Sequence, residues 1–568
     1  MTRPASIAIG IIALLASVGR AQQTSIIHSP HNLSASGPGA IRASSEQEIC
    51  IFCHTPHNAA PMQPLWNRNV PVNAYTVYSS NSLVAVPGQP TGSSKLCLSC
   101  HDGTIALGGV LSRQQGIAMV GGITTLPPGA TNLGTDLSDD HPISFRYDAT
   151  LATRKTSLKP PGNLPRQIKL DHNSELQCTS CHDAHNDQYG KFLVMDNSQS
   201  QLCNSCHNTG RTSIQQHANC NACHKPHTAP SGAYLLTGRT VGETCIACHN
   251  GGAAPQGANV ASIMQGLSKH DTNPSVSLKT NVPNDVACND CHGSHTMENA
   301  SMSAPNISPK LGIVSGVNAG GATVSQASYE FEVCFKCHAQ QNPVQPAINR
   351  QIVQNNTLFQ FARSAVSYHP VEGPGKNVSN VPSLRPGLTT ASMIYCTDCH
   401  GSDTGGIGAL SANGPHGSNV RPLLKANYRT TDNTSESSDA YALCYSCHER
   451  TSILANQSFP LHSRHIVDLR TPCSVCHDSH GISSAQGNAM SNAHLINFDV
   501  DVVQRDTVTG LLQYRSTGIN SGTCTLTCHG FPHSPLGYGP GQATPMQMPG
   551  AIAPMRAPAA VPHIQRRR

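Results

Sequence analysis

The stretch CTSCHDAHNDQYGKFLVMDNSQSQLCNSCHNTGRTSIQQHANCNACHKPH, residues 178–227, decides the architecture of this chain. It holds three copies of the pattern C-x-x-C-H, which recurs along the whole sequence of 568 residues. A last copy, Cys524/Cys528/His529 (motif 12), has one extra residue between its cysteines, and the twelve copies together use all 24 cysteines. The eleven regular copies, motifs 1 to 11 in chain order, are Cys50/Cys53/His54, Cys97/Cys100/His101, Cys178/Cys181/His182, Cys203/Cys206/His207, Cys220/Cys223/His224, Cys245/Cys248/His249, Cys288/Cys291/His292, Cys334/Cys337/His338, Cys396/Cys399/His400, Cys444/Cys447/His448 and Cys473/Cys476/His477.

The repeated pattern predicts twelve covalently attached c-type haems. In C-x-x-C-H, two thiols bond the porphyrin vinyl groups and the adjacent histidine, here called proximal, ligates the iron. A disulfide scaffold would not require a histidine after every second cysteine, and it suits much shorter chains. Structural zinc sites use C-x-x-C pairs but rarely fix the next residue as histidine in every pair. For motif 12 we expect the longer spacing still to let both thiols reach the ring.

The composition favours a fold organised by these haems. Only 12% of residues are charged and 4% aromatic, and the chain holds 48 glycines, 40 prolines and the single Trp66. Such a chain would struggle to fill a conventional core or to form long helices. The prediction is mostly irregular coil around closely packed haems, with a short helical turn carrying each motif and little sheet apart from strands such as Tyr75–Tyr78. We expect removal of the haems to unfold the protein.

The N-terminal residues predict export. Arg3, the apolar run Ala5 to Val18 and Gly19-Arg20-Ala21 read as a secretory signal over residues 1–21. No later segment reaches the length of a membrane span. The expected location is extracellular or at the outer cell surface, with the periplasm as an alternative. The net charge of +5 is spread too thinly to indicate a nucleic-acid partner.

Uneven spacing of the motifs predicts several modules after the signal peptide. We expect a tetrahaem module over 22–210, a module with haems 5 to 7 over 211–300 and a module with haems 8 to 12 over 329–533. The Gly/Ser/Ala-rich stretch 301–328 is the expected linker. Residues 534–568, rich in Pro, Gly, Ala and Met, are expected to be disordered.

Of the 30 histidines, eighteen remain after the twelve proximal ones, and they are candidates for the opposite, distal face of each iron. Five fall in the frame C-x-x-C-H-x-x-H, namely His57, His185, His227, His295 and His480. A histidine three residues after the proximal one can hardly reach the far face of its own haem, so we expect it to ligate a neighbouring haem. Methionine could serve instead, but Met residues follow no repeated spacing. The loop candidates are His31, His141, His217, His270, His369, His416 and His465, with His28, His172, His462, His494 and His533 as alternates and His563 assigned to the tail.

Two parts of the sequence resemble known families. The segments PHNLS (30–34), CIFCHTPHNAAPMQPLWNRN (50–69), YTVYSS (75–80), KLCLSCHDGTIALG (95–108), DDHPISF (139–145) and CTSCHDAH (178–185) are similar to extracellular filament-forming (nanowire, OmcE/OmcS-type) cytochromes. This resemblance covers residues 24–210 and implies His31, His57, His141 and His185 as distal ligands, one of which could cross a subunit boundary. The remainder resembles doubled C-x-x-C-H cytochromes, which implies His217, His227, His270, His295, His369, His416, His465 and His480. The chain departs from the filament proteins in carrying eight further motifs and a long tail.

The expected function is electron transfer rather than catalysis. Histidine on both faces of each iron leaves no open site, and electron hopping needs only close spacing and similar potentials. Expected partners are other multihaem cytochromes, extracellular electron acceptors and, through the filament resemblance, further copies of the chain. One alternative is a reductase of nitrite, hydroxylamine or a sulfur oxyanion with one open haem, although the C-x-x-C-K variant of one such family is absent. A third alternative is a structural filament whose haems mainly shape the fold.

Overall fold

The computed structural model describes residues 25–60, 65–210, 212–252, 259–270, 286–339, 348–377, 381–404, 414–518 and 520–540. The expected signal peptide, most of the expected tail and His563 lie outside these residues. The described chain forms two compact units. Unit 1 contains residues 25–247 and 293–299, and unit 2 contains the other described residues from 248 onward. The chain leaves unit 1 within motif 6, and His295 returns to unit 1 just after motif 7.

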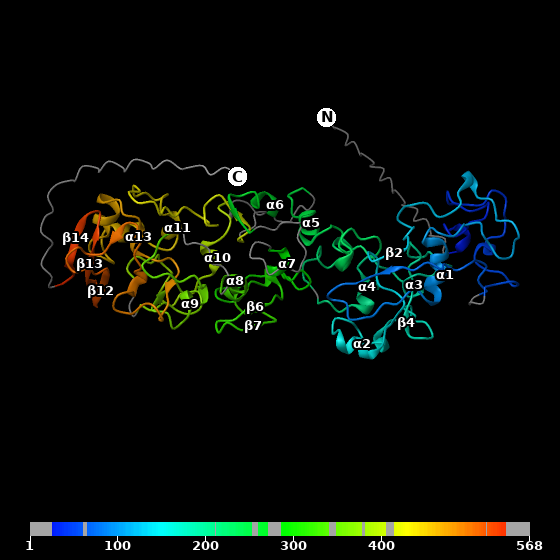
Figure 1. The fold of residues 1–568 in the computed structure, drawn as a ribbon, viewed down its shortest axis with the longest axis horizontal. Helices are drawn as coiled ribbons and strands as arrows, with labels where there is room; N and C mark the ends of the chain where they lie inside the picture. Colours follow the sequence, from blue (N-terminus) through cyan, green and yellow to red (C-terminus); the bar gives the residue numbers. More distant parts are fainter. Residues whose placement is uncertain are drawn as a thin grey trace, which may run out of the picture. The chain divides into compact units, whose positions relative to one another are not determined.

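Unit 1 consists of short helices and two-residue strands joined by loops (Figure 1). Its paired strands are β1 with β2, in parallel, and β3 with β4, antiparallel. The elements in order are η1 (Ile26–His28), η2 (Cys50–Phe52), β1 (Thr76–Val77), α1 (Gly92–His101), η3 (Val120–Gly122), β2 (Asp136–Leu137), β3 (Phe145–Arg146), α2 (Ala149–Arg154), η4 (Pro161–Asn163), β4 (Glu175–Leu176), α3 (Cys178–Cys181), α4 (Gln201–Cys206), η5 (Cys220–Ala222), η6 (Ala233–Leu235) and α5 (Val241–Ile246).

Unit 2 has the same character but ends in a four-stranded sheet of strands β11 to β14. Three further strand pairs, β5 with β9, β6 with β7 and β8 with β10, are two residues long. The elements are α6 (Val260–Ile263), β5 (Ser268–Lys269), α7 (Cys288–Cys291), η7 (Pro309–Leu311), β6 (Gly316–Val317), β7 (Thr323–Val324), α8 (Glu330–His338), α9 (Thr357–Phe361), β8 (Ser367–Tyr368), α10 (Cys396–Cys399), β9 (Gly417–Ser418), α11 (Ala442–Tyr445), α12 (Arg450–Leu454), the π-helix η8 (Arg464–Asp468), α13 (Cys473–Cys476), β10 (Gly481–Ile482), η9 (Ala493–Leu495), β11 (Val503–Gln504), β12 (Gln513–Gly518), β13 (Ser521–Cys528) and β14 (Phe531–Tyr538).

The fold class expected from composition is confirmed. The longest described helix, α1, has 10 residues, and most of the others are a single turn. Buried apolar residues form several small clusters, and cysteines of the motifs pack on most of them. No described helix combines the length and the apolar character needed to traverse a bilayer. Of the expected strand Tyr75–Tyr78, the two central residues form β1.

Two sequence expectations need correction and a third stretch has more structure than its composition suggested. Motif 12 lies on the long strand β13 and not on a helical turn. Strand β14 continues to Tyr538, so order extends past the expected tail boundary at residue 534. Residues 301–328 carry η7, β6 and β7, and Val314 and Ala327 are buried there against Val333 of α8.

Candidate functional site

Each of the eleven regular motifs begins in one helical turn. Residues three apart on a helix are neighbours with Cβ atoms about 5–6 Å apart, so the two thiols of a motif lie side by side. The same turn fixes the following histidine, because its backbone N–H donates to the carbonyl of the first cysteine, at 2.8 Å for His54 and 2.9 Å for His182. Two adjacent thiols with an imidazole beside them are the arrangement that attachment to one porphyrin requires.

The expectation that a helical turn carries the whole motif is wrong for the second cysteine of motifs 1, 5, 6 and 10. Cys53 follows the end of η2, Cys223 follows the end of η5, Cys248 lies two residues beyond α5, and Cys447 lies two residues beyond α11. Cys248 is exposed, whereas Cys223 and Cys447 are half-buried. Loop contacts still hold three of these cysteines. The carbonyls of Cys53, Cys223 and Cys447 accept 2.9 Å hydrogen bonds from the backbone N–H groups of Asn67, Thr237 and Arg385, respectively. A fixed second cysteine therefore does not require a complete helical turn.

The proximal imidazoles face other imidazoles at one recurring distance. Two imidazoles bound to opposite sides of one metal, at about 2.0–2.1 Å per metal–nitrogen bond plus half a ring on each side, have ring centres about 6 Å apart. The described residues include nine such pairs with ring centroids 6.0–6.4 Å apart: His54–His185, His101–His31, His182–His227, His207–His141, His224–His295, His292–His416, His338–His270, His400–His480 and His477–His462.

Motif 6 lies where the chain passes from unit 1 to unit 2. Cys245 belongs to unit 1, and Cys248 and His249 belong to unit 2. The carbonyl of His249 accepts hydrogen bonds from the backbone N–H groups of Val260 and Ala261 at 3.0 and 3.1 Å, which ties the motif to α6. Burial lowers the pKa of His416 most, followed by the imidazoles of His292, His270 and, with the smallest effect, His249. The haem of motif 6, with Cys248 and His249 as its binding residues, stays a prediction from the sequence.

Hydrogen bonds turn the iron-binding nitrogen of the paired rings toward the gap between them. A backbone carbonyl can only accept, so an Nδ1 bonded to a carbonyl carries the hydrogen and leaves the lone pair on Nε2. Such a partner also fixes the ring orientation of a metal-binding histidine. At 2.7–3.3 Å these bonds join His31 to Ala184, His101 to Thr131, His141 to Pro142, His182 to Lys191, His224 to Tyr234, His270 to Pro415, His400 to Pro422 and His477 to His494. His369, which lies outside the nine pairs, bonds the carbonyl of Ser479 in the same way at 2.7 Å.

A recurring turn supplies three of these carbonyls. Lys191, Tyr234 and His494 each adopt a left-handed backbone conformation, with φ of 52°, 60° and 59°. The next residue in each turn is left-handed too, and the residue after it forms a single β-bridge with the proximal histidine. Non-glycine residues rarely adopt this conformation, and such strain concentrates at functional sites. Sequence reasoning missed this turn, whose signal is the recurrence of KFL (191–193), YLL (234–236) and HLI (494–496) after a motif.

The histidines of the C-x-x-C-H-x-x-H frame reach back along the chain. His185, His227, His295 and His480 each face the proximal histidine two motifs earlier and not that of their own motif. Side chains that the sequence did not single out hold two of them. The Nδ1 of His227 bonds Asp140 at 3.0 Å, and that of His480 bonds Gln360 at 3.0 Å.

The other sequence candidates are placed in several ways. His31, His141, His270 and His416 each face a proximal ring from a loop, whereas His57 is exposed and contacts no imidazole among the described residues. At motif 11 the facing ring is His462, an alternate in the sequence analysis, and not His465. The other candidates face no proximal ring in these pairs. His369 lies beside His448, and His465 lies close to His533. His217 precedes η5, and His28 and His172 are on the surface.

Burial keeps several of these imidazoles neutral. The ordinary histidine pKa is 6.5, and burial, aided by a nearby imidazole, lowers it to about 4 in His141, His416 and His448 and to about 3 in His462. A neutral imidazole is the form that binds iron. Burial also raises the pKa of the Cys53, Cys181 and Cys399 thiols to about 12, so these thiols carry their protons in the folded chain.

Consecutive motifs are joined directly in several places. The backbone N–H of Cys178 in motif 3 donates to Ser94, three residues before motif 2, at 3.0 Å. The same device links Cys220 of motif 5 to Ser200, three residues before motif 4, at 2.9 Å. Thr397 of motif 9 donates through its backbone and hydroxyl to Glu330, which starts the helix of motif 8. Motifs 1 and 2 share one apolar cluster through Cys53 and Cys100, and motifs 10 and 11 another through Cys444 and Cys473.

The surroundings of motif 1 include space for a large group. A cavity of about 540 Å³ is lined by Cys50, His54, Leu65 and Arg113. Beside this motif Arg68 is fully buried and donates to the carbonyls of Leu107, Ala106 and Ser99 at 2.6, 2.8 and 3.4 Å. The cavity, the paired thiols and the spaced imidazoles all fit haem at this motif.

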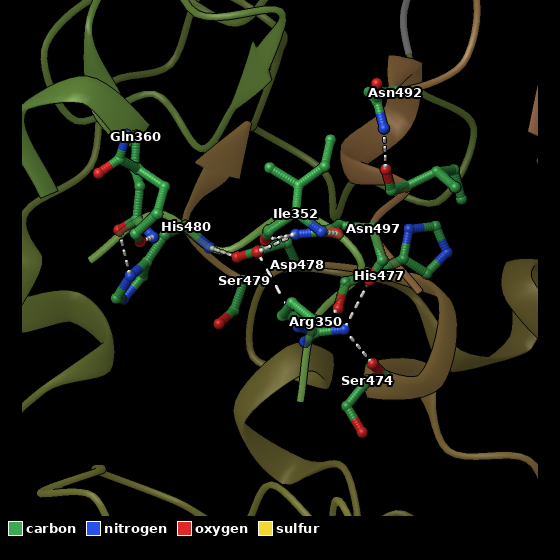
Figure 2. A network of polar contacts seen from close by, with 12 residues as sticks. Arg350, Ile352, Gln360, Ser474, His477, Asp478, Ser479, His480, Asn492 and Asn497 are labelled. Carbon is green, nitrogen blue, oxygen red and sulfur yellow. Dashed lines mark hydrogen bonds and ion pairs between the residues drawn. The ribbon is translucent and has the colours of Figure 1, made fainter. Parts of the chain in front are cut away.

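A second buried arginine organises motif 11 (Figure 2). Arg350 donates to the carbonyls of Ser474, His477 and Asn497 at 2.5, 2.9 and 2.8 Å, and its Nε lies 3.9 Å from Asp478. Asn497 in turn donates to Asp478 at 3.0 Å. These contacts hold the turn that carries the cysteines of motif 11. On its other side the imidazole of His477 faces His462.

Motif 12 does not share this geometry. Its cysteines lie on an extended strand, and the Nε2 of His529 contacts the carboxylate of Asp432 at 2.9 Å. The cause is tertiary, because β13 pairs with strands on both sides.

Comparison with known proteins agrees with the geometry of the regular motifs. Three segments, 172–212, 214–254 and 389–452, match the doubled CXXCH motif family, and they contain motifs 3 to 6, 9 and 10. No curated protein matches the chain. The doubled motif is the signature of multihaem c-type cytochromes, which hold covalently attached haem c and transfer electrons. The chain carries that signature.

Proposed function

We propose that this chain is an electron relay in which c-type haems, each held between two histidines, pass electrons outside the cytoplasm. The observation that carries the proposal is the set of nine imidazole pairs with ring centroids 6.0–6.4 Å apart, each containing one proximal histidine. Haem supplies the one-electron chemistry when bound. The chain's own residues tether the porphyrin through thiols, orient both imidazoles and exclude a third ligand.

The direct links between consecutive motifs support an electron path in sequence order within each unit. Ser94, Ser200 and Glu330 each tie the start of one motif to the next motif along the chain. Electron hopping requires such proximity and no moving part. A relay of this kind therefore needs a rigid frame, which the buried arginines and left-handed turns provide.

The partners we propose are other multihaem cytochromes and extracellular electron acceptors. The exposed imidazole of His57 is free of any described imidazole partner in the chain, so it is the ring available to a second copy if the protein forms a filament. Secretion remains part of this proposal, since haem c attachment takes place outside the bacterial cytoplasm.

Low-temperature electron paramagnetic resonance of the oxidised protein, with cyanide titration, tests the proposal. We expect low-spin signals and no cyanide binding at the nine paired sites. A high-spin signal that cyanide removes at one of these sites would contradict the relay and favour a reductase with an open iron. A purified chain without any haem would overturn the proposal altogether.

A further inference from the structure

Motif 12 has the residues of a haem site in a backbone that holds its thiols apart. Cys524 pairs with Tyr514 on one side and Leu536 on the other, and Cys528 pairs with Val503 and Phe531. With a rise of about 3.3 Å per residue, four residues of strand separate the two Cα atoms by about 13 Å. That is more than twice the spacing of about 5–6 Å on a helical turn.

The face that a porphyrin would need is already filled by protein. Side chains alternate along a strand, so Cys524, Leu526 and Cys528 share one face. Leu526 on that face is 5% exposed and packs with Val475 of motif 11 and Tyr514 of β12. Protein interiors are close-packed, so a macrocycle could enter only by separating these strands.

The imidazole of motif 12, His529, is hydrogen-bonded to the carboxylate of Asp432. The Nε2 of His529 donates to both oxygens of Asp432, at 2.9 and 3.1 Å, whereas a haem ligand must leave this nitrogen free. No imidazole ring pairs with His529 among the described residues. His465 lies near His529: burial lowers the pKa of His465 most, and the charge of His529 lowers it further. A haem at motif 12 would therefore need His465 as its second axial ligand.

We infer that motif 12 is not a haem site and that the chain carries eleven haems. Cys524 and Cys528 remain thiols on a sheet that covers the apolar side of motif 11, and the pair His529–Asp432 fastens that sheet to the loop before α11. This inference rests on the proposed function for the other eleven motifs. The C-terminal sheet then covers the haem of motif 11, which is the last haem along the chain.

Intact mass of the purified holo-protein decides the matter. We expect the polypeptide plus eleven haems, and alkylation after denaturation should label two cysteines per chain. The double variant Cys524→Ser and Cys528→Ser should keep eleven haems and lose both labels, and the matched control Cys473→Ser with Cys476→Ser should drop to ten haems.

Twelve haems on the unaltered chain, or loss of one haem from the Cys524/Cys528 variant, would overturn the inference. Twelve haems with one alkylated cysteine would overturn it too, since that result means a single thioether at motif 12. A chain without haem would instead overturn the proposed function, so the two failures are distinct. The measurement on the unaltered chain needs no variant to fold.

Discussion

Motifs 11 and 12 lie on one hydrophobic cluster and contain the same three residue types, but their backbones give them different chemistry. In motif 11 Val475 enters the cluster from a helical turn, and Arg350 holds the carbonyls of that turn. In motif 12 Leu526 enters the same cluster from a strand. The difference teaches that the backbone decides the local geometry of a cysteine pair. A helical turn brings the two thiols of motif 11 together, whereas the strand β13 holds those of motif 12 apart.

The largest expected effect is a loss of stability in acid, where the buried imidazoles around motif 11 become protonated. Folding lowers the pKa of His462 to about 3 and of His448 and His480 to about 4, from an ordinary value of 6.5. The unfolded chain therefore binds more protons below pH 6.5, and stability present above pH 6.5 is lost as the pH falls toward 4.

Denaturant midpoints measured between pH 8 and pH 4 check this prediction through the visible haem bands. We expect a constant midpoint above pH 7 and a falling midpoint, with loss of low-spin bands, below about pH 6. A midpoint that rises as the pH falls would show that these histidines are charged in the folded protein.

Replacing Arg350 should have the next largest effect. Arg350→Met removes three hydrogen bonds to carbonyls and leaves Asp478, 13% exposed, without its cation. Breaking a buried charged network typically costs about 3–5 kcal/mol of unfolding free energy. Arg385→Met is the matched control, since its ion pair with Glu449 is 52% and 35% exposed and should contribute about 1 kcal/mol or less. Chemical denaturation that shows equal losses for the two variants would refute the bracing role of Arg350.

The histidine opposite motif 11 should control one haem only. In His462→Met, methionine replaces imidazole on one iron and raises its reduction potential. Redox titration should then show one of the haems reduced at a higher potential, with the others unchanged. His533→Met is the control and should leave the titration curve unchanged, because His533 faces no proximal ring among the described residues.

The smallest effect is expected at the half-buried ion pair of motif 12. Asp432→Asn should lower the unfolding free energy by about 1 kcal/mol or less, because the partners are 30% and 26% exposed. Visible and paramagnetic spectra should not change. A new low-spin signal in this variant would mean that freeing His529 creates an iron ligand, contrary to a haem-free motif 12.

The sequence predicts the local geometry of most regular motifs well, because two thiols three residues apart need only one helical turn. It also predicts the irregular fold, since glycine and proline leave little room for long helices. It does not predict where a turn ends early, because loop contacts such as Arg385 with Cys447 then fix the second cysteine.

Long-range contacts lie beyond what the sequence predicts. Arg350 reaches Ser474 across 124 residues of chain, and β13 forms only because strands on both sides pair with it. His462 and His465 are three residues apart on one side of a helical segment, so spacing could not say which one faces His477.

A near-atomic density map of the purified holo-protein tests the central claim most directly. The account predicts an iron between His54 and His185, and likewise between the members of the eight other pairs, with both imidazoles bound through Nε2. An iron in any of these sites with an open face, or with a different residue opposite its proximal histidine, would contradict the account.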